Sequence, residues 1–214
     1  MMDTDTLIRS LAADVRPVPH HSVGRRIGLG IGLGAVVTIA LIGWWLGFRP
    51  DYAVAMQGYS FWMKWIYTAS IGTVALAATI QLARPEPVKL RRLWLLGVPV
   101  LLLLAIGLVE IARAPREEWL AMWLGQSWKQ CPGIVLRLSA PIFIGPLWSY
   151  RRLAPTQLRA AGAVAGLASG ACAATLYCLH CPEVSALFVL TWYTLGIGLA
   201  TAIGALIGPR LLRW

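Results

Sequence analysis

The sequence predicts an all-α membrane protein: a six-transmembrane-helix bundle with both termini in the cytoplasm. Of its 214 residues, 58% are hydrophobic and 13% are charged, and the mean hydropathy is +0.67. A soluble domain is about 45–50% apolar and about 25% charged, so this chain has too few charges to cover a soluble surface. The spacing of the charges and the placement of the basic residues are two further observations that predict this fold.

Six stretches of the chain are almost free of charge and each is about as long as a membrane crossing. They cover residues 27–48, 65–83, 93–112, 130–150, 160–182 and 184–209. A helix needs about 20 residues to cross a hydrocarbon core about 30 Å thick, and it satisfies its own backbone hydrogen bonds in lipid. We therefore expect a cytoplasmic tail over 1–26, a membrane domain over 27–209 and a short cytoplasmic end over 210–214.

The basic residues predict the orientation of these helices. With the tail inside, 13 of the 19 Lys and Arg residues fall on the inner side, five fall on the outer side, and Arg137 lies within a span. Positive charge accumulates on the cytoplasmic side of membrane proteins, so we expect a multi-pass membrane protein with both termini in the cytoplasm. The net charge of +10 then reflects topology and contact with anionic lipid of the bilayer, and we expect no direct binding of nucleic acid.

The residue pattern of the tail predicts a short amphipathic helix. Asp5 is placed to cap the helix, and an apolar stripe runs along it through Leu7, Ile8, Leu11 and Val15. A helix of about three turns is only marginally stable alone. Two interpretations stay open: the helix lies on the inner leaflet as an anchor, or its stripe folds against a protein partner.

The predicted loops are too short to build a soluble catalytic domain. The inner loops 84–92 and 151–159 hold nine residues each, and the longer outer loops cover 49–64 and 113–129. No convincing catalytic acid/base pair is present. We therefore do not expect an enzyme.

Glycines at four-residue spacing predict where helices touch, because they let two backbones approach closely. The glycines with this spacing are Gly162, Gly166 and Gly170, and the pairs Gly28/Gly32, Gly30/Gly34 and Gly204/Gly208. The pattern indicates compact packing.

Four cysteines are present, and the topology places Cys131 and Cys181 at the outer face of the membrane. Both would meet an oxidising compartment in a bacterium with a periplasm. They could form a redox-sensing pair if their Cα atoms come within about 7 Å, form a permanent disulfide, or stay inert. Cys178 and His180 could add an accessory thiol or a soft-metal site. Cys172 lies well within its span, where a thiol acts as a small apolar group.

Arg137 is the most expensive residue to place in a membrane, because it lies about two turns into the fourth span. It must face protein or a wet cavity, or extend outward to the interface. Glu110, at the outer end of the third span, is one candidate partner, and Glu183 is another. Pro132, Pro141 and Pro146 predict a kink in the same span. Transporters build substrate sites from such helices, so this feature also suits a small transporter or efflux protein.

Short motifs follow one another along the chain in a specific order. They are Asp5-Thr-Leu-Ile-Arg-Ser-Leu-Ala-Ala-Asp14 with Pro17-Val-Pro19, Phe61-Trp-Met-Lys64, Trp128 with Cys131, Leu138-Ser-Ala-Pro141, Leu179-His-Cys181, Trp192-Tyr193 and Leu212-Arg-Trp214. In this order, and nearly from end to end, the chain resembles the NrsF-type six-span membrane anti-sigma factors of proteobacteria.

The resemblance implies an inner-membrane protein that holds an extracytoplasmic-function sigma factor inactive. It implies release of that factor under periplasmic oxidative or heavy-metal stress, sensed by a cysteine pair that maps to Cys131 and Cys181. Together with the tail pattern, it predicts that the stripe binds the sigma factor, with no cofactor. Cys172 and Cys178 depart from the family pattern.

Two other classes of function stay open on the residues alone. A small transporter would explain Arg137, although the sequence shows no internal repeat of the kind that transporters often carry. A membrane thiol oxidoreductase would explain Cys178 and Cys181 together with Cys131. That enzyme would need a quinone or an exchange partner.

Overall fold

The computed structural model describes residues 4–13, 22–83, 90–153 and 155–213, and within these ranges the chain is helical without a strand. The α-helices are α1 (Thr4–Ala13), α2 (Ser22–Leu41), α3 (Tyr52–Ala55), α4 (Tyr59–Leu82), α5 (Gly97–Arg113), α6 (Trp119–Leu124), α7 (Cys131–Tyr150), α8 (Leu158–Tyr177), α9 (Ala186–Phe188) and α10 (Thr194–Leu211). A π-helical turn, Ile42–Leu46, continues α2, and another, Val189–Tyr193, joins α9 to α10. Two 3₁₀ segments, Leu90–Leu96 and Arg116–Glu118, flank α5.

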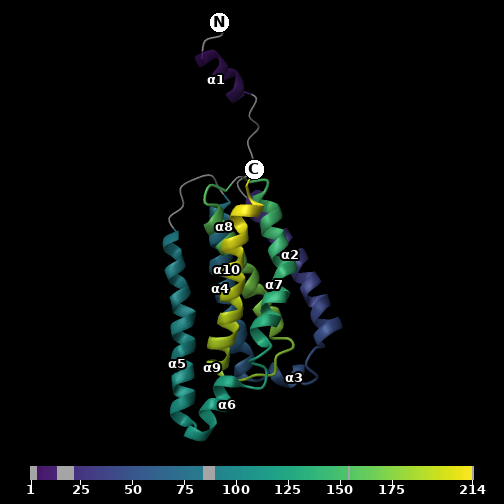
Figure 1. Cartoon of the computed structure of the whole chain (residues 1–214), viewed down its shortest axis with the longest axis vertical. Helices are drawn as coiled ribbons and strands as arrows, with labels where there is room; N and C mark the ends of the chain where they lie inside the picture. Colours follow the sequence, from purple (N-terminus) through teal and green to yellow (C-terminus); the bar gives the residue numbers. More distant parts are fainter. Residues whose placement is uncertain (1–3, 14–21, 84–89, 154, 214) are drawn as a thin grey trace.

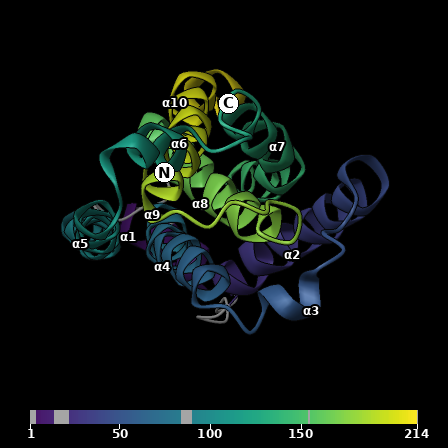
Figure 2. The same ribbon diagram turned by 90° about the horizontal axis from the view of Figure 1, so that it is seen from below.

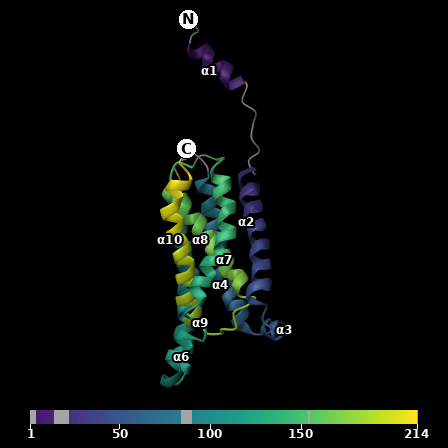
Figure 3. The same ribbon diagram turned by 45° about the vertical axis from the view of Figure 1, so that its right-hand side comes forward.

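Six of these helical segments, within the part of the chain that is described, are long and apolar enough to cross a membrane, as predicted. They are Ser22–Leu46, Tyr59–Leu82, Leu93–Arg113, Cys131–Tyr150, Leu158–Tyr177 and Ala186–Leu211. They run side by side as one bundle (Figures 1 and 3). The bundle has a terminal end, where α2 begins and α10 finishes, and an opposite far end, where α3 and α6 lie (Figure 1).

The helix α8 is the centre of the bundle and α5 is its outlier (Figure 2). In their most apolar windows, 67% of the residues of the fifth span are buried, against 11% for the third. The difference follows from composition, since α8 is rich in Ala and Gly, whereas α5 carries large side chains that remain exposed, such as Leu101 and Leu102. Small residues allow close helix contacts in a bilayer, where burial of Leu against Leu gains little over lipid.

Glycines join α8 to α10, and α2 to α7, at backbone contact. A Cβ on Gly162 would overlap the carbonyl oxygen of Gly204, and a Cβ on Gly30 would lie 2.8 Å from the Cα of Gly145. The prediction from glycine spacing is confirmed for these contacts. It is wrong for Gly28 and Gly32, which face open space, because they lie on the outer side of α2.

The tail helix α1 lies beyond the terminal end of the bundle (Figure 1). It covers Leu7, Ile8 and Leu11, and the side chain of Ile8 is exposed. Val15, the fourth residue of the predicted stripe, lies outside the described residues.

Candidate functional site

Three of the four cysteines meet in one buried cluster at the far end of the bundle. Cys131 begins α7, whereas Cys178 and Cys181 follow the end of α8, and all three are fully buried. The thiol of Cys131 has Cys178 and Cys181 as electrostatic neighbours. All the cysteines are free thiols. The fold therefore brings together the two residues that sequence reasoning paired, and it adds Cys178 beside them.

The accessory thiols differ from each other. Cys178 donates a hydrogen bond to the carbonyl of Ala174 at 3.3 Å, and burial raises the pKa of its thiol to about 12. Cys172 lies nearly two turns deeper in α8, half-buried and facing Gly72 of α4, so it stands apart from the cluster.

The aromatic residue Tyr193 places an unpaired hydroxyl beside the thiols. The residue is fully buried, and its electrostatic neighbours are Cys131, Cys178 and Cys181. Its hydroxyl is the one buried side-chain oxygen or nitrogen in the described residues without a hydrogen-bond partner. Buried polar groups are nearly always paired in stable proteins. This hydroxyl lies beside the sulfurs of Cys178 and Cys181, so it is placed to donate to negative charge that develops on either of them.

Lys64 supplies a positive charge to the same cluster, and sequence reasoning missed it. It was assigned to the outer loop 49–64, but α4 begins at Tyr59 and carries Lys64 into the core. The side chain is fully buried, and its ammonium donates to the carbonyls of Cys181 at 3.0 Å and Glu183 at 2.6 Å. A buried ammonium is costly unless it is well bonded. The motif Phe61-Trp-Met-Lys64 was the one signal that could have identified it.

The carboxylate of Glu183 joins the segment before Cys131 to the segment after Cys181. It accepts hydrogen bonds from the backbone N–H of Gln126 at 2.7 Å and from the N–H and hydroxyl of Ser127, each at 3.0 Å. Gly125 precedes this contact with φ +56°, and a Cβ there would meet the Glu183 side chain. A glycine is required at this turn because both its backbone angle and its close contact exclude a side chain.

A short strap, Gly47–Asp51, crosses the turn that carries Cys178 and Cys181. The backbone N–H of Arg49 donates to the carbonyl of Leu179 at 3.2 Å, and the guanidinium of Arg49 pairs with Asp51 at 2.6 Å. This hydrogen-bonded pair lowers the pKa of the exposed Asp51 carboxyl. The strap therefore lies over the turn that carries these two buried thiols.

The structure does not assemble the soft-metal site that Cys178 and His180 suggested. The ring nitrogen Nδ1 of His180 lies 2.8 Å from the carbonyl of Gly47, and the ring packs on Tyr177. Among the described residues, no three His, Cys, Asp or Glu side chains are grouped as metal ligands. The strap holds the Nδ1 of His180 in a hydrogen bond, and the accessory role of Cys178 and His180 stays a prediction.

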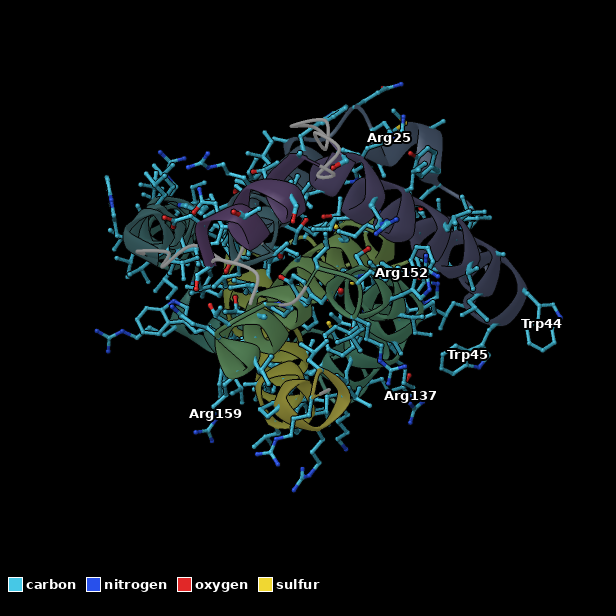
Figure 4. The ribbon with its side chains drawn as sticks, turned by 90° about the horizontal axis from the view of Figure 1, so that it is seen from above. Arg25, Trp44, Trp45, Arg137, Arg152 and Arg159 are labelled. Carbon is cyan, nitrogen blue, oxygen red and sulfur yellow. The ribbon has the colours of Figure 1, made fainter. Side chains whose placement is uncertain are left out.

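Glu110 and Arg137 are not partners. Glu110 accepts hydrogen bonds from the Tyr59 hydroxyl at 2.7 Å and from the backbone N–H of Ala186 at 2.8 Å, and so caps the start of the sixth span. The guanidinium of Arg137 lies 5.8 Å from the ring centre of Trp45, on the periphery of the bundle (Figure 4). Arg49–Asp51 is the one ion pair within the described ranges. The Glu110 carboxylate therefore bonds the start of the sixth span, whereas the Arg137 guanidinium contacts the Trp45 ring.

The outward position of Arg137 also weakens the transporter interpretation. Its side chain is exposed and does not enter a cavity between helices. The charge that suggested a substrate site therefore lies on the outer surface, where a cation–π contact and the interface accommodate it.

Comparison with known proteins identifies the family. A family model described as NrsF, negative regulator of sigma F, matches residues 11–214. The chain belongs to the NrsF family. It is 38% identical to the "Probable anti-sigma-F factor NrsF" of Azospira oryzae over 216 residues, and 39% identical to the "Anti-sigma-F factor NrsF" of Caulobacter vibrioides over 215 residues. Both matches cover 100% of this chain and of the relative. No solved structure matches the chain.

In this NrsF-family protein, Lys64→Met is expected to slow the reaction of the clustered thiols with iodoacetamide by about tenfold or more, because a nearby positive charge favours the thiolate. The rate is measured on the purified full chain by mass spectrometry of each cysteine peptide. Lys64→Arg keeps the charge and should retain most of the rate.

The matched control is Lys129→Met, which removes an exposed lysine near the same end of the bundle. It should leave the thiol rates unchanged. Equal rates in Lys64→Met and the wild type, at equal melting temperature, would show that Lys64 has a purely structural role.

Proposed function

We propose that the protein is an inner-membrane anti-sigma factor that sequesters an extracytoplasmic-function sigma factor and releases it under periplasmic oxidative or heavy-metal stress. One observation carries the proposal: along its full length, the chain matches two proteins whose names call them anti-sigma-F factors. The relatives' names supply the partner class. The tail helix and the thiol cluster lie at opposite ends of the bundle (Figure 1), which supports separate roles for the two ends in binding and in sensing.

In the proposed topology, the terminal end of the bundle faces the cytoplasm. The positive-inside rule supports this orientation, since 13 of the 19 basic residues belong to that side. The tail helix is then available to a cytoplasmic sigma factor, and its apolar stripe of Leu7, Ile8, Leu11 and Val15 binds by helix-in-groove contact. The far end, with its thiols, faces the periplasm.

The proposed signal is a change of bonding at Cys131 and Cys181. When an oxidant such as a peroxide accepts two electrons, the two thiols lose two protons and an S–S bond forms between them. A soft metal ion instead displaces the protons and binds the sulfurs as thiolates. Either product draws the start of α7 toward the segment after α8. The Glu183 contact already couples these two segments.

The helix α7 supports a route from the thiols to the tail. It begins at Cys131 and packs against α2 through Gly145 on Gly30. The hydroxyl of Thr38 in α2 also donates to the carbonyl of Leu138 in α7 at 3.0 Å. Because the backbones touch, a displacement of α7 moves α2 with it. Since the tail precedes α2 in the chain, the tail's affinity for the sigma factor changes in the two thiol states.

The tail is tested by Leu7→Asp combined with Leu11→Asp. We expect this variant to lose the sigma factor that co-purifies with the tagged full-length protein from its host under reducing conditions. The loss should be about tenfold or more, because two carboxylates would enter an apolar contact. Sigma-dependent transcription should be high without stress.

The matched control for the tail is Thr6→Asp combined with Ala13→Asp, which adds the same charge to the opposite face of α1. It should retain the sigma factor. If Leu7→Asp/Leu11→Asp also retains it and represses normally, the tail is not the binding element. If no sigma factor co-purifies with the wild type at equal expression, the anti-sigma assignment itself is wrong.

A further inference from the structure

A long apolar groove runs between α2 and α7 on the outer surface of the bundle, away from the thiol cluster. Its volume is about 930 Å³. Its walls are large side chains that remain exposed, namely Leu29, Leu33, Val37, Ile144 and Trp148. Its floor is the close contact of Gly30 with Gly145 and of Gly34 with Ile142. The glycines therefore create a furrow that larger residues would fill.

One end of the groove is strongly basic. Arg25, Arg26 and Arg152 line it at the terminal end of the bundle. The guanidinium carbons of Arg26 and Arg152 lie 5.9 Å and 5.0 Å from the ring centre of the same residue, Trp148. In Figure 4, Arg152 lies on the side of α7 that faces α2, Arg25 lies across α2 from it, and Arg159 lies on another side of the bundle.

Among the residues that the structure describes, no acidic side chain pairs with any of these three arginines. The one ion pair in the part of the chain that is described, Arg49–Asp51, lies at the opposite end of the bundle. The guanidinium groups of Arg26 and Arg152, which both lie over the Trp148 ring, repel each other, so an anion placed between them would be favoured. A guanidinium presents paired N–H donors that match the oxygens of a phosphate.

The length of the groove matches one leaflet of a membrane. From Arg26 to Val37 the helix rises about 16 Å, and half of a hydrocarbon core is about 15 Å. The charges lie at one end only, and Trp148, half exposed beside them, is the residue type that settles at the headgroup level. The shape and charge thus fit a molecule with an anionic head and long apolar chains.

We propose that this groove binds an anionic phospholipid from the leaflet at the terminal end of the bundle. The phosphate lies between Arg26 and Arg152, with Arg25 beside it, and one acyl chain lies along Leu29, Leu33 and Val37. A free phosphate would leave the apolar length empty. A zwitterionic lipid would bring its own cation to a site that already holds three positive charges.

The test is native mass spectrometry of the full-length protein, purified in detergent, delipidated and titrated with phosphatidylglycerol or with phosphatidylcholine of the same acyl chains. The wild type should bind phosphatidylglycerol at least about tenfold more tightly, since each basic residue at a membrane surface contributes up to roughly a fivefold gain for anionic lipid and at least two arginines face the phosphate. Arg26→Ala combined with Arg152→Ala should bind the two lipids equally. Leu33→Trp should weaken both by filling the furrow.

Two matched controls distinguish a specific lipid site from a general effect of positive charge and from a general effect of an added bulky side chain. Arg159→Ala combined with Arg210→Ala removes the same charge from exposed positions outside the groove, and Leu206→Trp adds the same ring to an exposed position on α10. Both should bind phosphatidylglycerol like the wild type.

Equal binding of the two lipids by the wild type would overturn the proposal. So would an equal loss in the Arg159/Arg210 control, or unaltered binding in Leu33→Trp. Each variant is first shown to be monodisperse with an unchanged melting temperature. The result does not depend on the sigma factor, so the lipid site and the proposed function succeed or fail separately.

Discussion

Replacing both Cys131 and Cys181 by Ser is expected to abolish the release of the sigma factor by oxidant. Coupling between two sites is typically about 1–3 kcal/mol, which corresponds to about 5–150-fold in affinity. Under the proposed mechanism, the wild type should lose that factor in affinity for the sigma factor on oxidation, and the double variant should change by less than about twofold. The measurement is co-purification before and after peroxide, together with a sigma-dependent reporter.

Cys172→Ser is the internal control, because Cys172 is half-buried in mid-span and stands apart from the cluster. It should respond like the wild type. Cys178→Ser separates the three clustered thiols: if it alone abolishes the response, the reacting pair includes Cys178 in place of one of the predicted residues. Normal stress induction in the Cys131/Cys181 double variant would exclude these thiols as the sensor.

The largest effect on folding is expected from Gly162→Leu. The position lies at the contact of α8 with α10, where even a Cβ would overlap the carbonyl oxygen of Gly204. The two backbones must separate to admit a side chain, and overpacking of this kind costs about 1–3 kcal/mol or more. We expect a lower melting temperature in detergent and a reduced amount of protein in the membrane.

Gly198→Leu is the matched substitution on α10, since nothing lies within 4 Å of a Cβ there. It should change the melting temperature little, because the new side chain would point away from the neighbouring helices. Similar destabilisation in both variants would mean that leucine is harmful at any glycine of these helices, and that the α8–α10 contact has no special role.

Much of the candidate site could be predicted from residue types and their order. Alternating positive charge predicted which ends of the spans share a side, and this was enough to place Cys131 and Cys181 at the same end. The structure brings them into one buried cluster. Their neighbours could not be predicted in this way. Lys64 was counted with a loop, because a charged residue at the edge of an apolar stretch looks like a boundary until the start of α4 is known.

The polar partners were also beyond pattern analysis. Glu110 and Glu183 were both plausible partners of Arg137 by charge, yet both carboxylates accept hydrogen bonds from backbone N–H groups near the far end. Backbone donors exposed at a helix start or in a turn carry no signal in the sequence. Hydrogen bonds from these backbone N–H groups to the two carboxylates are more favourable than a long-range ion pair with Arg137, because the arginine side chain can extend outward to the interface.

The sequence by itself determined the class of the fold, the number of spans and the family. Hydrophobicity and length follow directly from composition, because each residue has its own transfer free energy between water and lipid. Only the tertiary structure decided that α8 is central, that Lys64 is buried beside three thiols, and that α2 and α7 leave a furrow with a basic end. These features depend on which faces of the helices meet. Glycine contacts and hydrogen bonds between residues far apart in the chain select those faces, and no local pattern specifies them.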